Sequence, residues 1–145
     1  MNEKLEVERK MCLIYPFNPN TTVVANIQRN LYLASLLGVK NAKFYPVYKD
    51  TKDSTIDKSI DIVDKLVSTS LELGYDEALP HGFFKGIGGF SPKIFYYNEE
   101  KRMYDGYVNL DEYIDNNSST LENRESVGKR LIKRKNNSVN SKSVL

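Results

Sequence analysis

A glycine-rich segment, Lys85-Gly86-Ile87-Gly88-Gly89-Phe90-Ser91, holds the residues of this 145-residue chain that are best suited to binding chemistry. Glycines let backbone N–H groups converge on an anion, and a neighbouring lysine adds positive charge. The predicted anion-binding residues are Lys85, Gly86, Gly88, Gly89 and Ser91. The segment has neither the Gly-Lys-Ser/Thr triplet of a P-loop nor a clear helix after it. The alternative is an architectural loop that directs Phe83, Phe84 and Phe90 into the core.

Nucleophilic and acid–base residues are scarce, because the chain holds one histidine and one cysteine. His81 and Cys12 could form a nucleophile–base pair only if folding brought them together. Cys12 lies in an apolar run, where a thiol is usually a small inert core residue. His81 lies between Pro80 and Gly82, which is more typical of a loop histidine bonded to backbone. We therefore predict no catalytic residue, and the sequence favours a protein that is not an enzyme without deciding the question.

Metal ligands are equally few. One histidine and one cysteine cannot build a structural zinc site. Asp57, Asp61 and Asp64 fall on one helical face and could hold a hard cation. A solvated helix face explains these carboxylates more simply. The sequence thus predicts no metal and no other cofactor.

The C-terminal segment differs in charge from the rest of the chain. Residues 116–145 hold seven basic and two acidic residues, whereas residues 1–115 hold fourteen basic and seventeen acidic ones. Such a basic segment usually seeks a polyanion or an acidic surface. The predicted docking residues are Lys129, Arg130, Lys133, Arg134 and Lys135. Because the segment has no aromatic residue, it could attract phosphates but could not stack on bases. The alternative is a solubilising tail without a fixed target.

Apolar runs and turn residues predict the order β-α-β-α for the first half of the chain. Strands are expected at 11–17 and 42–48, each followed by a helix. The first helix should be capped by Asn20 or Thr21, and the second by Ser54 or Thr55. Pro46 cannot donate to a ladder, so the second strand should lie at a sheet edge or end there.

The second half predicts a loop, a hairpin and a tail. Residues 79–92, rich in glycine, proline and phenylalanine, are expected to form a structured loop. Aromatic-rich strands at 93–97 and 103–108 should pair as an antiparallel hairpin, with a short helical turn at 111–114. The whole predicts an α+β, or small α/β, two-layer sandwich with helices on one face of the sheet. Its parts are a polar arm at 1–10, one globular domain at 11–115 and a flexible tail at 116–145, with one further helix expected at 126–135.

A helix-turn-helix is a second interpretation of residues 30–47, in which Ala34, Gly38 and Val39 have the required spacing. Pro46 would then interrupt the recognition helix, at a cost of about 3 kcal/mol. An ordinary helix stop at Gly38 before a strand fits the pattern better.

Another local pattern resembles a known family. Ile14 and Pro16 at a strand end, Asn26-Ile27 early in the next helix and Pro46 after a second strand resemble small nucleoside deoxyribosyltransferase-like proteins. That chemistry needs an acidic nucleophile in a Gly/Ser-rich context, and no such residue follows. The resemblance therefore implies no catalytic residue here.

Three classes of function are left open. The first is a non-catalytic interaction or structural protein, such as a small subunit or accessory of a viral or other large assembly that docks through the basic tail. The second is a nucleic-acid-binding accessory protein that uses the same tail. The third is a nucleotide- or anion-binding module, or a small enzyme, with its site at 85–91.

The expected partners are another protein or a second copy of the chain, with nucleic acid as a further candidate through the tail. No run approaches the about 20 apolar residues that span a bilayer, so no membrane partner is expected. The acidic N-terminus lacks a signal peptide, and a single cysteine suggests a reducing compartment. We therefore expect a cytoplasmic or host-intracellular protein, or a virion component, that is not secreted.

Overall fold

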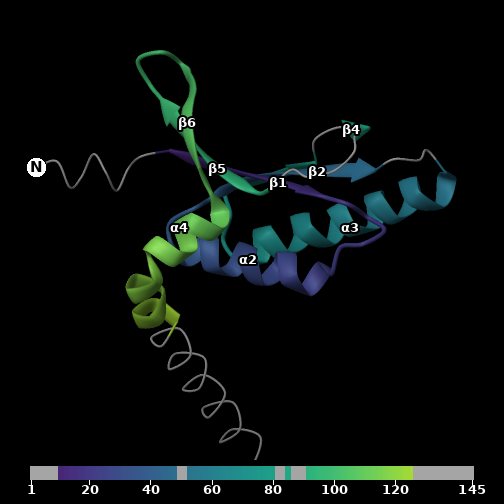
Figure 1. Cartoon of the computed structure of the whole chain (residues 1–145), viewed down its shortest axis with the longest axis horizontal. Coiled ribbons are helices and arrows are strands. Elements are labelled where there is room, and N and C mark those ends of the chain that lie inside the picture. The colour runs from purple at the N-terminus through teal and green to yellow at the C-terminus, as the bar shows by residue number, and fades with distance from the viewer. Residues whose placement is uncertain (1–9, 49–51, 81–83, 86–90, 126–145) are drawn as a thin grey trace, which may run out of the picture.

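The computed structural model describes residues 10–48, 52–80, 84–85 and 91–125 (Figure 1). It confirms the predicted α+β fold with a two-layer arrangement. The elements, in chain order, are β1 (Met11–Phe17), α2 (Val24–Leu36), β2 (Asn41–Tyr48), α3 (Asp53–Glu72), β3 (Glu77–Pro80), β4 (Phe84–Lys85), β5 (Lys93–Asn98), β6 (Met103–Asn109) and α4 (Leu110–Asn116). Residues 118–125 form one more helical segment.

Five of the strands form one mixed sheet in the order β3-β2-β1-β5-β6, and β4 pairs with the end of β2. The strands β1, β2 and β3 are parallel, because a helix follows each of the first two and carries the chain back across the sheet. β5 runs antiparallel to β1 and forms the predicted hairpin with β6. Figure 1 shows α2 and α3 lying across one face of the sheet, with the tip of the hairpin projecting beyond it.

The core lies between the sheet and these two helices. Every second residue of a strand points to the same face, so Leu13 of β1 and Phe44 of β2 point toward the helices and are completely buried. Leu31 of α2 and Leu66 of α3 meet them from the other layer. The buried hydroxyl of Tyr75 donates a hydrogen bond of 2.8 Å to the backbone oxygen of Leu31. The packing of the sheet against α2 and α3 therefore supplies the stability of the fold.

The helices begin at positions other than the predicted caps. The chain at 18–22 forms a turn in which the backbone N–H groups of Thr21 and Thr22 donate to the oxygen of Asn18. Because this turn takes up Asn20 and Thr21, α2 starts only at Val24. α3 starts at Asp53, one residue before the earlier of its predicted caps. Neither helix has a side-chain cap at its first turn, so the capping predictions are wrong.

The prediction that the strand with Pro46 lies at a sheet edge or ends there is also wrong, because β2 lies between β1 and β3 and continues to Tyr48. Pairing with β3 ends at Phe44, and pairing with β4 begins at Val47. On the side of β2 away from β1, Pro46 therefore falls between two partners, where a residue without an N–H is tolerated, while on the other side it pairs with Phe17 of β1. Pro16 is placed similarly, since the last pair between β1 and β5 joins Ile14 to Lys93. The two prolines mark the end of the sheet at which β1 extends beyond β5 and β2 extends beyond β3.

A strand also occupies the start of the segment predicted to be a loop at 79–92. β3 is only four residues long, too short for a clear alternating pattern. Its register is set by backbone contacts, because Asp76 and Glu77 both donate to the oxygen of Lys40 at the entrance of β2. Tertiary pairing rather than local sequence therefore forms this strand.

The folded body continues through Glu125. Leu121 is buried against Leu33 and Leu37, and Arg124 donates to the backbone oxygen of Leu36. These contacts attach the helical segment 118–125 to α2, so residues 116–125 of the expected tail lie against the body. The helix expected at 126–135 lies outside the described residues.

Candidate binding face of the sheet

The sheet has a second face, opposite α2 and α3, over which no described helix lies (Figure 1). We call it the open face. Its side chains alternate along each strand with those of the core. They include Ile14 and Pro16 of β1, Tyr45 and Val47 of β2, and Phe95 of β5. All five are apolar or aromatic, which is unusual for a sheet face that is not packed against a second layer.

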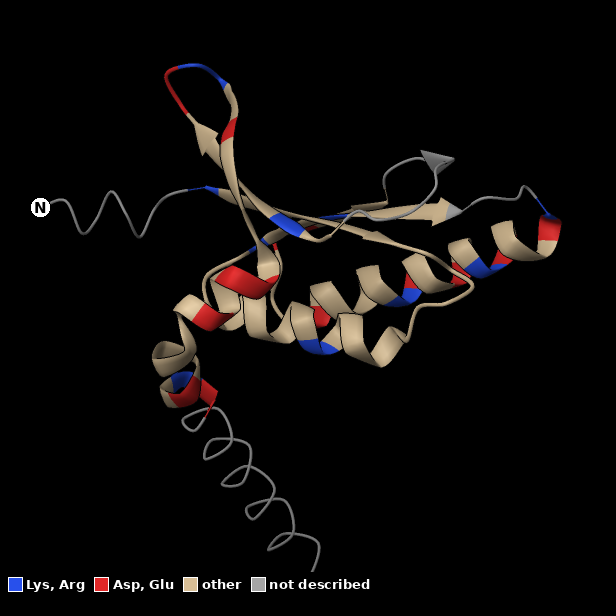
Figure 2. Ribbon diagram, in the orientation of Figure 1, with Lys and Arg blue, Asp and Glu red and all other residues tan. Residues whose placement is uncertain are grey.

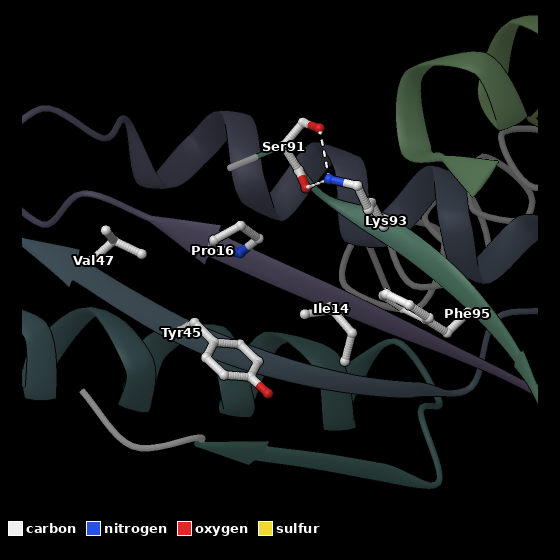
Figure 3. Close-up of a pocket in the computed structure, with 7 residues that line it drawn as sticks. All are labelled: Ile14, Pro16, Tyr45, Val47, Ser91, Lys93 and Phe95. Atoms are coloured by element: carbon white, nitrogen blue, oxygen red, sulfur yellow. Dashed lines mark hydrogen bonds between the residues drawn. The ribbon is translucent and has the colours of Figure 1, made fainter. Parts of the chain in front are cut away.

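A pocket of about 310 Å³ lies on the open face, at the end where β1 extends past β5 and β2 extends past β3. Five of the seven described residues that line it are apolar or aromatic, and Figure 3 shows Tyr45, Ile14 and Phe95 on three adjacent strands. The pocket lies where the pairing of β1 with β5 and of β2 with β3 has ended, next to Pro16 and Pro46, while β1 and β2 remain paired with each other. The full lining is Ile14, Pro16, Tyr45, Val47, Ser91, Lys93 and Phe95.

One fixed cation lies at the rim of this pocket. The Nζ of Lys93 donates hydrogen bonds of 3.2 Å to both the backbone oxygen and the Oγ of Ser91 (Figure 3). The same ammonium lies 5.7 Å from the centroid of the Tyr107 ring. A cation at this distance from an aromatic face is held by the ring quadrupole as well as by its hydrogen bonds. Lys93 is thus a positive charge positioned at an apolar pocket.

Aromatic rings continue from the pocket across the hairpin. Phe95 and Tyr107 pack with ring centroids 5.4 Å apart, and Tyr97 and Tyr104 with centroids 5.3 Å apart. Lys10 lies 5.4 Å from the centroid of Tyr97, so each pair has a lysine over one ring. Tyr107 is 58% exposed and Tyr104 is 38% exposed. These rings offer flat apolar surface to solvent.

A β-bulge brings the two exposed tyrosines to the same face. Tyr104 and Tyr107 are three residues apart and would point to opposite faces of a regular strand. β6 contains one extra residue here, since Tyr107 pairs with Phe95 while Tyr104 pairs with Tyr97. Gly106 lies within the bulge at a φ of +92°, a conformation that glycine adopts without strain. The sequence analysis predicted the aromatic hairpin but missed this face, for which the only signal was Gly106 between the tyrosines.

No family model, characterised protein or solved structure matches this chain.

The only cysteine of the chain, Cys12, lies beneath the aromatic side chains of the open face. Cys12 points to the open face but is only 2% exposed. Burial raises the pKa of its thiol above the ordinary value, against the opposing effects of nearby Lys43 and of a hydrogen bond with Tyr104. A thiol in this state is a poor nucleophile. His81, which would be the base of a Cys12–His81 pair, lies outside the described residues.

The structure brings together little of the predicted anion site. Ser91 lines the pocket, and Lys85 lies in β4, where its backbone pairs with Tyr48. Gly86, Gly88 and Gly89 lie outside the described residues, as do the docking residues Lys129, Arg130, Lys133, Arg134 and Lys135. The anion site and the basic docking segment therefore stay predictions.

The described part of the chain offers neither a metal site nor a membrane-spanning helix. Within it, no three His, Cys, Asp or Glu residues come close enough to hold a metal ion, and Asp57, Asp61 and Asp64 do not form such a group. No helix among the described residues combines the length and the apolar character needed to cross a membrane.

Charge is distributed unevenly between the two sides of the molecule. α3 carries five acidic residues and two lysines, and α4 carries three acidic residues and no basic one. The open face and its border carry Lys10, Lys43 and Lys93 against the acid Glu77. At the hairpin turn, Glu99 and Glu100 lie near Tyr97, and Asp105 is paired with Lys101. Figure 2 shows the acidic positions along the helices. The open face is therefore the basic side of an acidic body.

Proposed function

We propose that this protein is a non-catalytic interaction protein, a small subunit or accessory of a larger assembly, which binds its partner through the open face. The observation that carries this proposal is the apolar pocket of about 310 Å³ on a sheet face without a described covering layer. Burying such surface gains about 25 cal/mol for each Å² removed from water. A partner that covers the open face would supply the second layer that most apolar sheet faces have.

The residues around the pocket support binding better than catalysis. Its described polar groups are Lys93, Ser91 and the hydroxyl of Tyr45. Lys93 is held by Ser91, and the nearby thiol of Cys12 is buried with a raised pKa. In a mostly apolar binding site, a few polar groups of this kind usually orient the partner and select its charge.

The basic C-terminal segment supplies a second contact in this proposal. Its cations, Lys129 to Lys135, follow the helical segment 118–125 that packs on α2. Two contacts on one chain raise the effective concentration of the second once the first has formed. The reduced, buried Cys12 supports a protein that works in the cytoplasm or within a virion.

The test compares two matched isoleucine substitutions in the full-length chain. Ile14→Glu places a carboxylate in the pocket, whereas Ile60→Glu places one on the exposed side of α3, where Ile60 is 47% exposed. Each protein is immobilised, and the protein and nucleic acid that it captures from an extract of its source cells are measured. We expect Ile14→Glu to lower capture at least about tenfold, because a partner that covers the pocket must remove the added carboxylate from water, which costs about 1.4 kcal/mol or more even beside its register neighbours Lys43 and Lys93.

Capture by Ile60→Glu should equal that of the unaltered protein. Thermal melting of each variant confirms that it is folded. Equal capture by folded Ile14→Glu and by Ile60→Glu would show that the open face is not the binding site.

A further inference from the structure

We propose that the open face binds single-stranded nucleic acid, whose bases stack on the exposed aromatic rings and whose phosphates lie near Lys10, Lys43 and Lys93. This inference rests on the proposed function and names the chemical class of its partner. It differs from binding through the basic tail, which has no aromatic residue and cannot recognise bases by stacking.

The first support is the combination of aromatic rings with ammonium groups. Tyr107 is 58% exposed, its ring packs on Phe95, and the Nζ of Lys93 lies 5.7 Å from its centroid. The second pair repeats this arrangement, with Lys10 placed at Tyr97. A base that stacks on such a ring brings its own phosphate within reach of the neighbouring lysine. Proteins that bind single strands combine these two features, a stacking platform and a positively charged path.

The second support is the width of the platform. Tyr45, Phe95 and Tyr107 lie on β2, β5 and β6, and β1 contributes Ile14 between the first two. Neighbouring strands are about 4.8 Å apart, so β2 and β6 are separated by about 14 Å across the sheet. A four-stranded sheet of comparable width stacks two or three bases in a common class of RNA-binding domain. The open face therefore has room for a short run of nucleotides.

The third support is the distribution of charge. α3 and α4 are acidic and would repel a polyanion, whereas the three lysines of the open face would attract it. A polyanion is thus directed to one side of the molecule. A second copy of the chain fits less well, because a two-fold interface through this face would gather the net positive charge of both copies in one interface.

A single strand suits this face better than a duplex. Bases in a duplex are stacked on one another and turned inward, so their faces cannot reach a flat sheet. The basic tail, in contrast, would attract the phosphates of a duplex and of a single strand. A preference for single strands would therefore report on the open face rather than on the tail.

The test measures fluorescence anisotropy of labelled oligouridylate, oligothymidylate and a duplex of equal length with the full chain. We expect tighter binding of both single strands than of the duplex. Tyr107→Ala should weaken single-strand binding about tenfold, since stacking contributes about 1–3 kcal/mol per base. The paired substitution Lys43→Glu and Lys93→Glu should weaken it further and make it less dependent on salt. Its control, Lys58→Glu with Lys65→Glu on α3, makes the same charge change and should not weaken binding.

A tryptophan gives a direct signal for stacking. The chain contains no tryptophan, so Tyr107→Trp would introduce the only one. Its indole should keep the affinity of the unaltered protein, and its fluorescence should be quenched when a base stacks on it. Leu71→Trp on α3, where Leu71 is 54% exposed, should not respond. Because tryptophan fills the space of tyrosine, this variant tests the inference even if Tyr107→Ala fails to fold.

Equal affinity for single strand and duplex would overturn the inference, and so would unchanged indole fluorescence when the Tyr107→Trp variant is saturated with a single strand. It is likewise overturned if the Ile14-dependent partner captured from extract is a protein that survives nuclease treatment. In that case the proposed function stands and only the partner class is wrong. If capture does not depend on Ile14 at all, the proposed function itself fails.

Discussion

The two faces of the sheet are built from the same strands but have opposite properties. Leu13 and Ile14 are neighbours in β1, and Leu13 is completely buried beneath the helices while Ile14 lines a pocket on the open face. On the helix side, buried polar groups such as the Tyr75 hydroxyl have partners. On the open side, tyrosine rings and lysines face outward. The difference indicates that one face provides the stability of the fold and leaves the other available for binding.

This division follows from the strand period of two. A substitution on the helix side should change the free energy of unfolding, whereas a substitution on the open side should change binding more than stability. Matched pairs of substitutions, one at a buried position and one at a more exposed position, can therefore measure how far the two faces differ.

The largest difference is expected between Leu13→Ala and Ile14→Ala. Leu13 is 0% exposed within the core, and removing its side chain should lower the free energy of unfolding by about 3 kcal/mol. Ile14 is only partly covered, so its truncation should cost about 1 kcal/mol. Urea denaturation of both variants measures the two values. Equal losses would mean that the open face is as tightly packed as the core, and would contradict the proposed difference between the two faces.

A smaller difference is expected between Leu121→Ala and Leu79→Ala. Leu121 is 5% exposed and packs on α2 with Leu33 and Leu37, whereas Leu79 of β3 is 43% exposed. Leu121→Ala should cost about 2 kcal/mol, the lower end of the range for buried leucines, because its cluster is small. Leu79→Ala should stay within about 0.5 kcal/mol. Thermal melting measures both, and an unchanged Leu121→Ala variant would mean that residues 118–125 add nothing to the body.

The sequence predicted the fold well where local patterns decide the structure. The two helices, the first two strands and the aromatic hairpin all follow from apolar spacing and turn residues, and each is present. It failed where tertiary pairing decides. Pro46 suggested an edge strand, but the gap between the partners β3 and β4 tolerates a proline inside the sheet. Leu121, surrounded by polar residues, gave too weak a pattern to reveal that it packs on α2.

The binding face was harder to predict than the fold. The aromatic residues of the hairpin were recognised, but their common side depends on the bulge at Gly106, which shifts the alternation by one residue. The pocket combines Tyr45, Phe95 and Lys93 from strands that are distant in sequence. Sequence spacing within one segment cannot show which residues of another strand lie beside it. Only the register of the sheet provides that information.

The smallest expected effect concerns two tyrosines. Tyr75 lies on the helix side with its hydroxyl bonded to Leu31, and burial raises its pKa well above the ordinary value of 10.0. Tyr75→Phe should cost about 1 kcal/mol at neutral pH through the lost hydrogen bond. Tyr107→Phe, at a ring that is 58% exposed, should cost nothing measurable.

The Tyr75→Phe and Tyr107→Phe variants should also differ in how their stability depends on pH. Above pH 10 the unfolded chain loses the phenolic proton that folded Tyr75 keeps. The contribution of Tyr75 to the free energy of unfolding is therefore fully present below pH 10 and declines as the pH rises above it. The decline is about 1.4 kcal/mol for each pH unit. Other buried tyrosines, such as Tyr15, also have a raised pKa and add to the alkaline loss of the unaltered protein. Urea denaturation between neutral and alkaline pH should therefore show a shallower decline in Tyr75→Phe than in Tyr107→Phe. Parallel declines would mean that Tyr75 is as accessible to hydroxide as a tyrosine of the open face, and that the two faces differ less than their burial suggests.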